Sequence, residues 1–309
     1  FFSEVTYGNQ FHVSAIQSKG YSISIWEVIE ESTGAVKKYN ADENYGLSID
    51  FKFHSDINVV PVYIGNTHTI SFRDVFYNEV GSQIVQYRES MSKIDVPSRI
   101  GYSFLGYYYT DPETRRETCF FDDSGCPTTV YPFDYCIAVK AKWKANEYLV
   151  SLNTNGGHLD GRQEYSFTYN QYYSLPTPRK IGYQFLYWCH NGQKVESFGY
   201  DWGFAEDVQL DAFYKAIQSK VTLNFNDGVI DGSGLSTLTM TYDMEYTLPN
   251  MKKTGYDFKY WQDDYGRSYA LNGYWENTDV TSLSAYYTPK KYQLILMSDG
   301  SQYSTKTVT

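Results

Sequence analysis

The residues of this chain best suited to covalent chemistry are its cysteines. Cys119, Cys126 and Cys136 stand close together in the sequence, and Cys189 stands alone. Cys119 and Cys126 bracket a short loop that can close as a hairpin, so we expect one disulfide within residues 119–136, as in an extracellular protein. A bridge that uses Cys136 and a set of four buried thiols are the alternatives, because sequence does not determine connectivity.

Other reactive groups form no constellation. The histidines fall in different parts of the chain, with no two at the spacing of metal ligands: His12, His54, His68, His158 and His190. Asp122-Asp123-Ser124-Gly125 and Asp263-Asp264-Tyr265-Gly266 have the composition of turns. A calcium ion held by their carboxylates is the alternative, but neither string has the ligand alternation of an EF-hand loop. The sequence also lacks Gly-x-Ser-x-Gly, a phosphate-binding glycine loop and Cys-x-x-Cys. We therefore predict no enzyme, no catalytic or metal-binding residue and no cofactor.

Tyrosine is the other residue type with binding chemistry. Tyr107-Tyr108-Tyr109 and Tyr172-Tyr173 could stack on sugar rings if their side chains were exposed. Packing between neighbouring strands is the favoured interpretation, because the chain has 33 tyrosines and spreads them along its whole length.

One short pattern recurs at intervals that fit an array of small modules. In four places a Gly-Tyr pair is followed by an aromatic residue six positions after the glycine, and the glycines are 81, 81 and 73 residues apart. Intervals of this size are typical of tandem modules with repeated cores. We expect the module cores to contain Gly20, Tyr21, Trp26, Gly101, Tyr102, Tyr107, Gly182, Tyr183, Trp188, Gly255, Tyr256 and Trp261.

The segments around each Gly-Tyr pair predict β structure. Proline-bearing runs precede three of the pairs, at Val96-Pro97, Leu175-Pro176 and Leu248-Pro249. No stretch keeps a helical apolar period for three turns, although a short helical turn before each Gly-Tyr pair is compatible with the proline. Alternation of apolar and polar residues predicts strands at 149–152, 165–169, 208–214, 221–225, 238–242 and 283–287.

The ordered set of motifs resembles the Listeria–Bacteroides repeat family, the modules of internalin-B-type B-repeats. The matching features are Asn155-Gly156-Gly157 after an opening strand, Leu-Pro before Gly-Tyr, and Gly-Tyr-x-Phe-x-x-Trp at 182–188 and 255–261. Residues 67–146 depart from the pattern, because Tyr107 replaces the tryptophan and no Asn-Gly-Gly is present. The N-terminal unit resembles a divergent bacterial repeat of the same kind. The resemblance implies a bacterial exported protein with small α+β, β-grasp-like modules, each with one short helix.

The predicted organisation is an elongated, mainly β array of four modules and part of a fifth. Module boundaries are expected where a closing strand meets a polar linker. The expected segments are a divergent module at 1–66, a module with a cysteine-containing insertion at 67–146, modules at 147–217 and 218–289, and the opening strands of a further repeat at 290–309.

Composition narrows the classes of partner. The net charge of −10 and the lack of a basic cluster disfavour nucleic acid. No apolar run approaches the length of a membrane span. Modules of about 60–80 residues need large side chains to build a stable core, and 33 Tyr, 18 Phe and 6 Trp supply them.

These features favour a non-enzymatic stalk or adhesin segment of a bacterial protein at the cell surface or outside the cell. Its partners would be neighbouring modules and a host-surface protein or glycan, bound through many weak contacts. Carbohydrate- or receptor-binding modules of a larger extracellular enzyme are one alternative. A filament subunit that self-assembles by strand addition is another.

Overall fold

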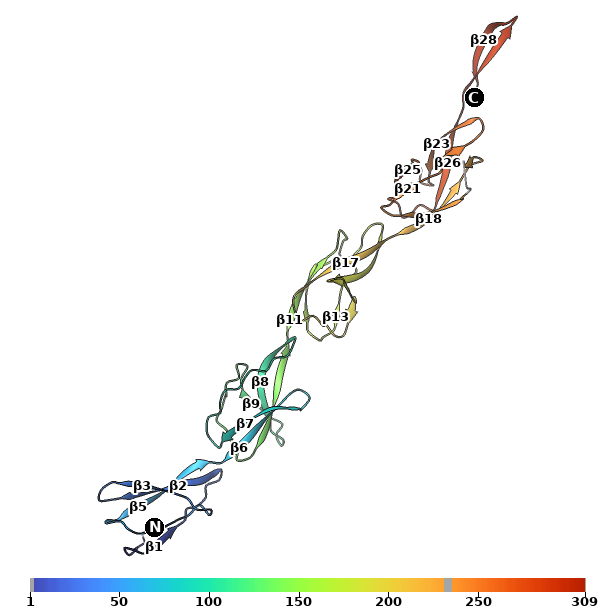
Figure 1. Ribbon diagram of the computed structural model, residues 1–309. Helices are drawn as coiled ribbons and strands as arrows, with labels where there is room; N and C mark the ends of the chain where they lie inside the picture. The colour runs from blue at the N-terminus through green and yellow to red at the C-terminus, as the bar shows by residue number, and fades with distance from the viewer. Residues whose placement is uncertain (1–2, 231–234, 309) are drawn as a thin grey trace. The chain divides into compact units, whose positions relative to one another are not determined.

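The computed structural model describes residues 3–230 and 235–308; Phe1, Phe2, residues 231–234 and Thr309 lie outside the described residues. Within this part of the chain the regular elements are all β-strands. The strands belong to two compact units, Phe1–Asn146 and Glu147–Thr309 (Figure 1). The predicted mainly β fold, with several small sheets in tandem, is confirmed.

The first unit contains two modules. Module 1 has a three-stranded sheet in the order β3-β2-β5 and a separate pair, β1 with β4. Its strands are β1 (Gln10–Val13), β2 (Tyr21–Glu30), β3 (Val36–Asn40), β4 (Leu47–Asp50) and β5 (Ile57–Gly65). Module 2 has one five-stranded sheet in the order β7-β6-β10-β8-β9. Its strands are β6 (Thr67–Arg73), β7 (Glu79–Gln86), β8 (Tyr102–Thr110), β9 (Glu117–Phe121) and β10 (Ile137–Ala145).

The second unit repeats the plan of module 2 twice. Module 3 has the sheet order β12-β11-β17-β14-β15, and module 4 has β20-β18-β26-β23-β24. In modules 2, 3 and 4 the first and last long strands lie side by side and run parallel, while the other neighbours are antiparallel. These strands are β11 (Glu147–Asn153), β12 (Glu164–Thr168), β14 (Tyr183–His190), β15 (Gln193–Val195), β17 (Val208–Ala216), β18 (Gln218–Asn224), β20 (Thr237–Thr241), β23 (Tyr256–Gln262), β24 (Ser268–Tyr269) and β26 (Ser282–Pro289).

Shorter pairs complete the second unit. Module 3 pairs β13 (Tyr173–Ser174) with β16 (Phe198–Gly199). Module 4 pairs β19 (Val229–Ile230) with β22 (Met251–Lys252), and β21 (Glu245–Thr247) with β25 (Asn272–Tyr274). A hairpin of β27 (Tyr292–Ser298) and β28 (Ser301–Val308) follows module 4. Its two strands pair antiparallel, as β6–β7, β11–β12 and β18–β20 do.

The short helix expected before each Gly-Tyr pair is not present in the described residues. The proline-bearing runs are extended, because the residue before proline is pushed away from helical backbone angles. At all four Gly-Tyr pairs, including the first, which no proline precedes, the chain makes a tight turn. The tyrosine N–H there donates to a carbonyl three residues earlier, at 2.9–3.1 Å, in the pairs Tyr21–Ser18, Tyr102–Arg99, Tyr183–Lys180 and Tyr256–Lys253. The glycine before the tyrosine has φ between 76° and 82° in all four copies, which only glycine adopts without strain.

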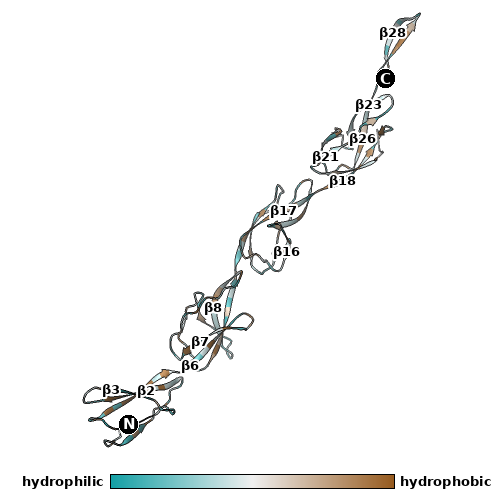
Figure 2. Cartoon of the chain, viewed as in Figure 1, coloured by the Kyte–Doolittle hydropathy of each residue, from teal (hydrophilic) through white to brown (hydrophobic). Residues whose placement is uncertain are grey.

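The motif tryptophans form the centre of modules 3 and 4. Trp188 and Trp261 are 0% exposed, and each indole N–H donates to a proline carbonyl, Pro176 or Pro249, at 2.9 Å. Leu175 and Leu248, the residues before those prolines, are buried beside them. The Leu-Pro element therefore covers the sheet and pairs the one polar atom of the tryptophan. Hydrophobic and hydrophilic residues alternate along the strands beneath it (Figure 2).

Modules 1 and 2 also bury the aromatic residue that stands at the position of the motif tryptophan. Trp26 is 2% exposed and donates to the carbonyl of Tyr45 at 3.3 Å. Tyr107 is 4% exposed, and its ring lies 4.9 Å from that of Phe72 and 5.2 Å from that of Phe104. In module 2 a cluster of aromatic rings thus occupies the region that an indole fills elsewhere.

A second buried aromatic residue was missed by the sequence analysis. Tyr131, Trp202 and Trp275 are at most 1% exposed in modules 2, 3 and 4. The Trp202 backbone accepts a hydrogen bond from Asn170 and donates one to Gln171. The buried indole N–H groups of Trp202 and Trp275 both lack an acceptor in the part of the chain that the structure describes. Their equal spacing of 20 residues from Gly182 and Gly255 is the signal that could have found them.

Replacing each indole of module 3 by phenylalanine should therefore have unequal effects. Trp188→Phe removes a buried ring segment and leaves the Pro176 carbonyl without its donor, whereas Trp202→Phe removes an N–H that has no partner. We expect Trp188→Phe to lower the free energy of unfolding of module 3 by about 1–2 kcal/mol more than Trp202→Phe. Urea unfolding followed by the amide NMR signals of module 3 measures the difference. Equal losses would show that the Pro176 hydrogen bond contributes nothing to stability.

Candidate functional site

The Gly-Tyr tyrosines lie at the ends of their modules and not in the cores. Each pairs with the last or next-to-last residue of the closing strands, as in Tyr183 with Ala216 and Tyr256 with Pro289. Tyr21, Tyr102 and Tyr183 are half-buried, and Tyr256 is 39% exposed. Their assignment to the module cores was wrong, because the turn at the glycine begins the strand at the sheet's end, where few side chains cover it.

The cysteines are free thiols, so the bridge expected within residues 119–136 is not formed. The hairpin register explains why: Phe121 pairs with Pro127, so Cys119 lies opposite neither Cys126 nor Cys136. The Cys119 thiol instead donates to the carbonyl of Phe121 at 3.2 Å, and the Cys136 sulfur accepts from the N–H of Thr69 at 3.4 Å. The insertion contributes Phe120 and Phe121 to the core of module 2.

The two tyrosine rows differ in exposure. Tyr107 and Tyr109 are buried in module 2, so the first row serves packing. In the second row Tyr173 packs against Trp202, with ring centroids 4.9 Å apart. Tyr172, however, is 59% exposed and its ring lies 5.5 Å from that of Tyr200, which is 80% exposed. This pair is one aromatic surface in module 3.

A second kind of aromatic pair occurs at equivalent places in modules 3 and 4. Tyr187 stacks on Phe213 with centroids 5.0 Å apart and an interplanar angle of 10°. Tyr260 stacks on Tyr286 at 4.8 Å and 5°. Phe213 is 50% and Tyr286 44% exposed, so these rings lie on the solvent face of the sheet, opposite the buried tryptophans. We call them the outer aromatic pairs.

A β-bulge produces both the buried tryptophan and the outer pair. In β14 the register shifts between Phe185 and Tyr187, so Leu186 is an extra residue without a partner in β17. Strict alternation would place Phe185 and Trp188 on opposite faces, since they are three residues apart. The bulge restores both to the core face and turns Tyr187 outward. The same shift occurs in β23 between Phe258 and Tyr260. The string Phe-x-x-Trp is therefore the sequence form of a bulged strand.

Module 2 has no outer aromatic pair. Gly106 stands where module 3 has Tyr187, and a Cβ there would overlap the carbonyl oxygen of Phe121. Lys142 stands opposite Gly106, forms an ion pair with Glu117 and lies 4.5 Å from the ring of Tyr108. The outer pairs are thus specific to modules 3 and 4 among the five-stranded sheets.

One groove of module 3 is lined mostly by polar residues. This groove of about 770 Å³ is lined by Ser151, Leu152, Asn153, Thr154, Arg162, Gln163, Glu164 and Gln209. These side chains can hydrogen-bond a polar ligand. They include one cation and one carboxylate and no histidine or cysteine, so the lining offers orientation and not a nucleophile with its base.

The two acidic strings are hairpin turns closed by their first aspartate. The Asp122 carboxylate accepts the N–H groups of Ser124 and Cys126 at 3.0 and 2.9 Å. Asp263 accepts those of Tyr265 and Arg267 at 3.0 and 2.9 Å. These oxygen atoms are already paired with backbone donors, as in an Asx-type turn. Across residues 3–230 and 235–308, no group of three or more histidine, cysteine and acidic side chains is placed to hold a metal ion.

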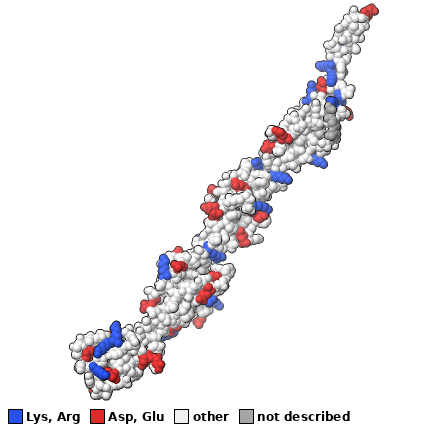
Figure 3. Space-filling view, in the orientation of Figure 1, with Lys and Arg blue, Asp and Glu red and all other residues white. Residues whose placement is uncertain are grey.

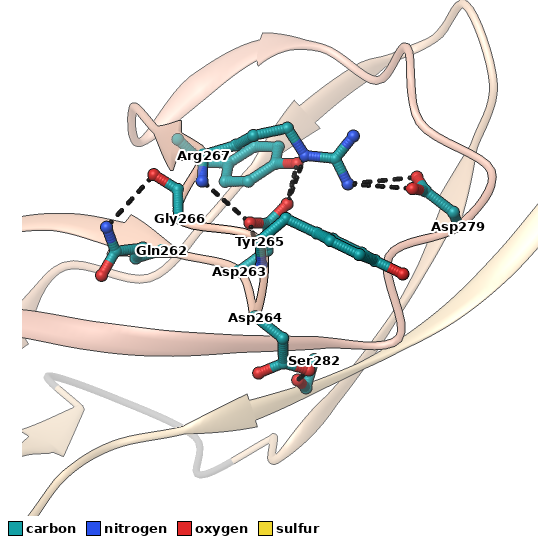
Figure 4. A network of polar contacts seen from close by, with 9 residues as sticks. Gln262, Asp263, Asp264, Tyr265, Gly266, Arg267, Asp279 and Ser282 are labelled. Atoms are coloured by element: carbon teal, nitrogen blue, oxygen red, sulfur yellow. Dashed lines mark hydrogen bonds and ion pairs between the residues drawn. The ribbon is translucent and has the colours of Figure 1, made fainter.

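Asp263 also organises the most extensive charged network in the second unit. Figure 4 shows its carboxylate facing Arg267, whose guanidinium also reaches Asp279. The Tyr269 hydroxyl donates to the same carboxylate at 2.9 Å. Burial raises the pKa of Asp263, but the hydrogen bonds from Arg267, Tyr269 and Tyr265 outweigh burial and hold this pKa below its usual value of 3.8. The network fixes the turn between β23 and β24.

Charges are otherwise interspersed. On the face drawn in Figure 3, acidic and basic side chains alternate and no large field of one sign appears. A surface of interspersed charges favours solubility.

Comparison with known families decides the nature of the second unit. Residues 148–212 and 220–285 match the model of the Listeria-Bacteroides repeat domain. These two segments are Listeria–Bacteroides repeats. They coincide with modules 3 and 4, where the Leu-Pro and Gly-Tyr-x-Phe-x-x-Trp motifs are complete, so the predicted resemblance is confirmed there. The divergent N-terminal repeat remains a prediction.

Similar proteins are longer than this chain. A protein of Evansella cellulosilytica named as a membrane protein is 27% identical over 249 residues, which cover 76% of this chain and 35% of that protein. Another, named as a Gly-rich membrane protein, is 26% identical over 204 residues, 64% of this chain and 22% of that protein. The chain thus spans only a minor part of both relatives. The solved Bacillus anthracis TIE protein aligns over 93% of this chain and 66% of its own, at 10% identity and a TM-score of 0.21, which is too low to show a common fold.

The carboxylate of Asp263 should make module 4 sensitive to acid. Because its pKa is lowered on folding, the stability it contributes is present above the unfolded pKa of about 3.9 and is lost as pH falls through the lower folded value. We expect Asp263→Asn to reduce the stability of module 4 by about 1–3 kcal/mol at neutral pH and by little at about pH 2. Asp264→Asn, in the same turn but exposed, is the control. Urea unfolding at both pH values, followed by module 4 amide signals, checks this; an equal loss at both would contradict it.

Proposed function

We propose that this chain is a non-enzymatic segment of a bacterial surface-exposed or secreted repeat protein, and that its modules act as a stalk that spaces and presents binding surfaces. The observation that carries the proposal is the length of the linkers. Gly65 ends β5 and Thr67 begins β6, so Asn66 alone separates modules 1 and 2. Ile217 alone separates β17 from β18. One-residue linkers suit spacing better than free reorientation.

Two further findings support a surface location. Listeria–Bacteroides repeats form modules 3 and 4, and the two relatives of Evansella cellulosilytica are named as membrane proteins. The described residues contain no helix long and apolar enough to cross a membrane.

A spacer requires an extended arrangement of modules. We expect small-angle X-ray scattering of the 309-residue chain to give a radius of gyration well above about 19 Å, the value for one compact domain of this length. The distance distribution should show a long tail. A radius of gyration near 19 Å would refute the stalk proposal.

A second candidate function is glycan or receptor binding by modules 3 and 4, and the outer aromatic pairs favour it. Ring faces on the solvent side of a sheet can stack on the C–H faces of sugars. Because the pair recurs in two successive modules, weak binding at each would add through avidity.

Removing one ring from each pair tests this candidate. In the double variant Phe213→Ala, Tyr286→Ala we expect binding to any glycan found on an array to fall by roughly tenfold or more. The exposed Tyr274, outside the pairs, provides the control variant Tyr274→Ala, which should bind as before. If the double variant and the control bind equally well, the outer pairs are not the site.

A further inference from the structure

One tyrosine of module 2 is seated on the Gly-Tyr turn of module 1. The Tyr87 ring lies directly over Gly20, so that a Cβ on Gly20 would overlap the ring. Tyr21 contacts the same ring edge-to-face, with centroids 5.2 Å apart and planes at 78°. The linker residue joins the backbones: Asn66 N–H donates to Gly20 O, and Tyr87 N–H donates to Asn66 O, both at 2.9 Å.

Modules 3 and 4 repeat this arrangement contact for contact. A Cβ on Gly182 would overlap the ring of Tyr242. Tyr183 meets Tyr242 edge-to-face at 5.6 Å and 71°, and its hydroxyl donates to Asp243 at 3.0 Å. Ile217 N–H donates to Gly182 O at 2.8 Å, and Tyr242 N–H donates to Ile217 O at 2.9 Å. Asn66 and Ile217 are chemically unlike, so the arrangement depends on their backbone and not on their side chains.

The seated tyrosine is anchored to the core of its own module. It directly follows the second strand, β7 or β20, and the residue after it, Arg88 or Asp243, has φ of 59° or 61°. The N–H of that residue donates to the carbonyl of Tyr131 or Trp275 at 2.7 Å, and these are the second buried aromatics of modules 2 and 4. The tyrosine is therefore held rigidly, so a contact made by its ring is transmitted to the whole module.

We propose that the Gly-Tyr turn is a docking seat for the tyrosine that directly follows the second strand of the next module, and that this seat fixes the orientation of module 2 on module 1 and of module 4 on module 3. Successive domains move independently by default unless an interface restrains them. Here the ring blocks any rotation about the one-residue linker that would move it across the glycine. This docking of neighbouring modules does not depend on whether the chain serves as a stalk.

The Gly-Tyr turn of module 4 offers an internal control. Gly255 has the same backbone angle as Gly182, with φ of 80° against 78°, but no described atom lies within 4 Å of the position of its Cβ. A glycine-to-alanine change therefore imposes the same backbone strain at both positions. Only at Gly182 does the new methyl group also collide with a seated tyrosine.

Residual dipolar couplings of the full-length, isotope-labelled chain test the proposal. In the unsubstituted protein, modules 3 and 4 should fit one common alignment tensor. We expect Gly182→Ala and Tyr242→Ala each to give two tensors that differ in magnitude and orientation, while Gly255→Ala keeps a common tensor. Tyr242→Ala guards against the case in which Gly182→Ala unfolds module 3, because it leaves the Gly182 turn unchanged.

Two results would overturn the seat. One is a common tensor that persists in Tyr242→Ala, because the ring would then not set the orientation. The other is a loss of the common tensor in Gly255→Ala as large as in Gly182→Ala, because backbone strain alone would then explain the effect. The amide chemical shifts of each module report, in the same spectra, whether that module is still folded.

Discussion

Every module of this chain depends on burying one large aromatic side chain in a body too small to form a conventional core. A sheet with one face in water has little apolar area to bury, so a side chain of tryptophan size contributes much of what is available. A buried indole N–H is more stable with an acceptor inside the module, and Trp188 and Trp261 each have one. In modules 3 and 4 the acceptor is the carbonyl of Pro176 or Pro249, twelve residues earlier. The run between proline and tryptophan must therefore fold back over the sheet, which determines the order of the motif.

Module 2 shows what happens when that tryptophan is absent. Tyr107 fills less space, and the insertion adds the buried rings of Phe120 and Phe121 to the same core cluster, with Phe133 packed against that cluster. Phe121 comes so close to β8 that only glycine fits at position 106. The cysteine-containing insertion thus compensates for a smaller central residue by adding rings. The same closeness removes the outer aromatic pair, because a tyrosine at 106 would collide with the backbone of Phe121.

The sequence predicted strands such as β17 well because their core-face residues alternate strictly with outward-facing ones, as in Val208, Leu210 and Ala212. The features it did not predict depend on contacts between distant segments. The cysteines of 119–136 looked like a hairpin pair, but the register of that hairpin is set by Phe121 and Pro127. The bulge was present in the sequence as the three-residue step from Phe185 to Trp188, and its meaning depends on knowing that both residues face the core. Tyr87 and Tyr242 could not be distinguished from many other tyrosines, since their role lies in the neighbouring module.

The Gly-Tyr pair occurs in four copies because each module needs it for its own turn. It makes a contact between modules only where a tyrosine of the next module reaches it. Its glycine is needed in every copy because the turn requires positive φ, including at Gly255, where nothing described lies against it. The absence of a side chain, which the turn demands, also leaves a flat surface on which a ring can rest. A neighbouring module then needs only a tyrosine directly after its second strand to use that surface. The glycine belongs to one module and the tyrosine to the next. The tyrosine can therefore be kept or lost without disturbing the fold of the module that carries the glycine.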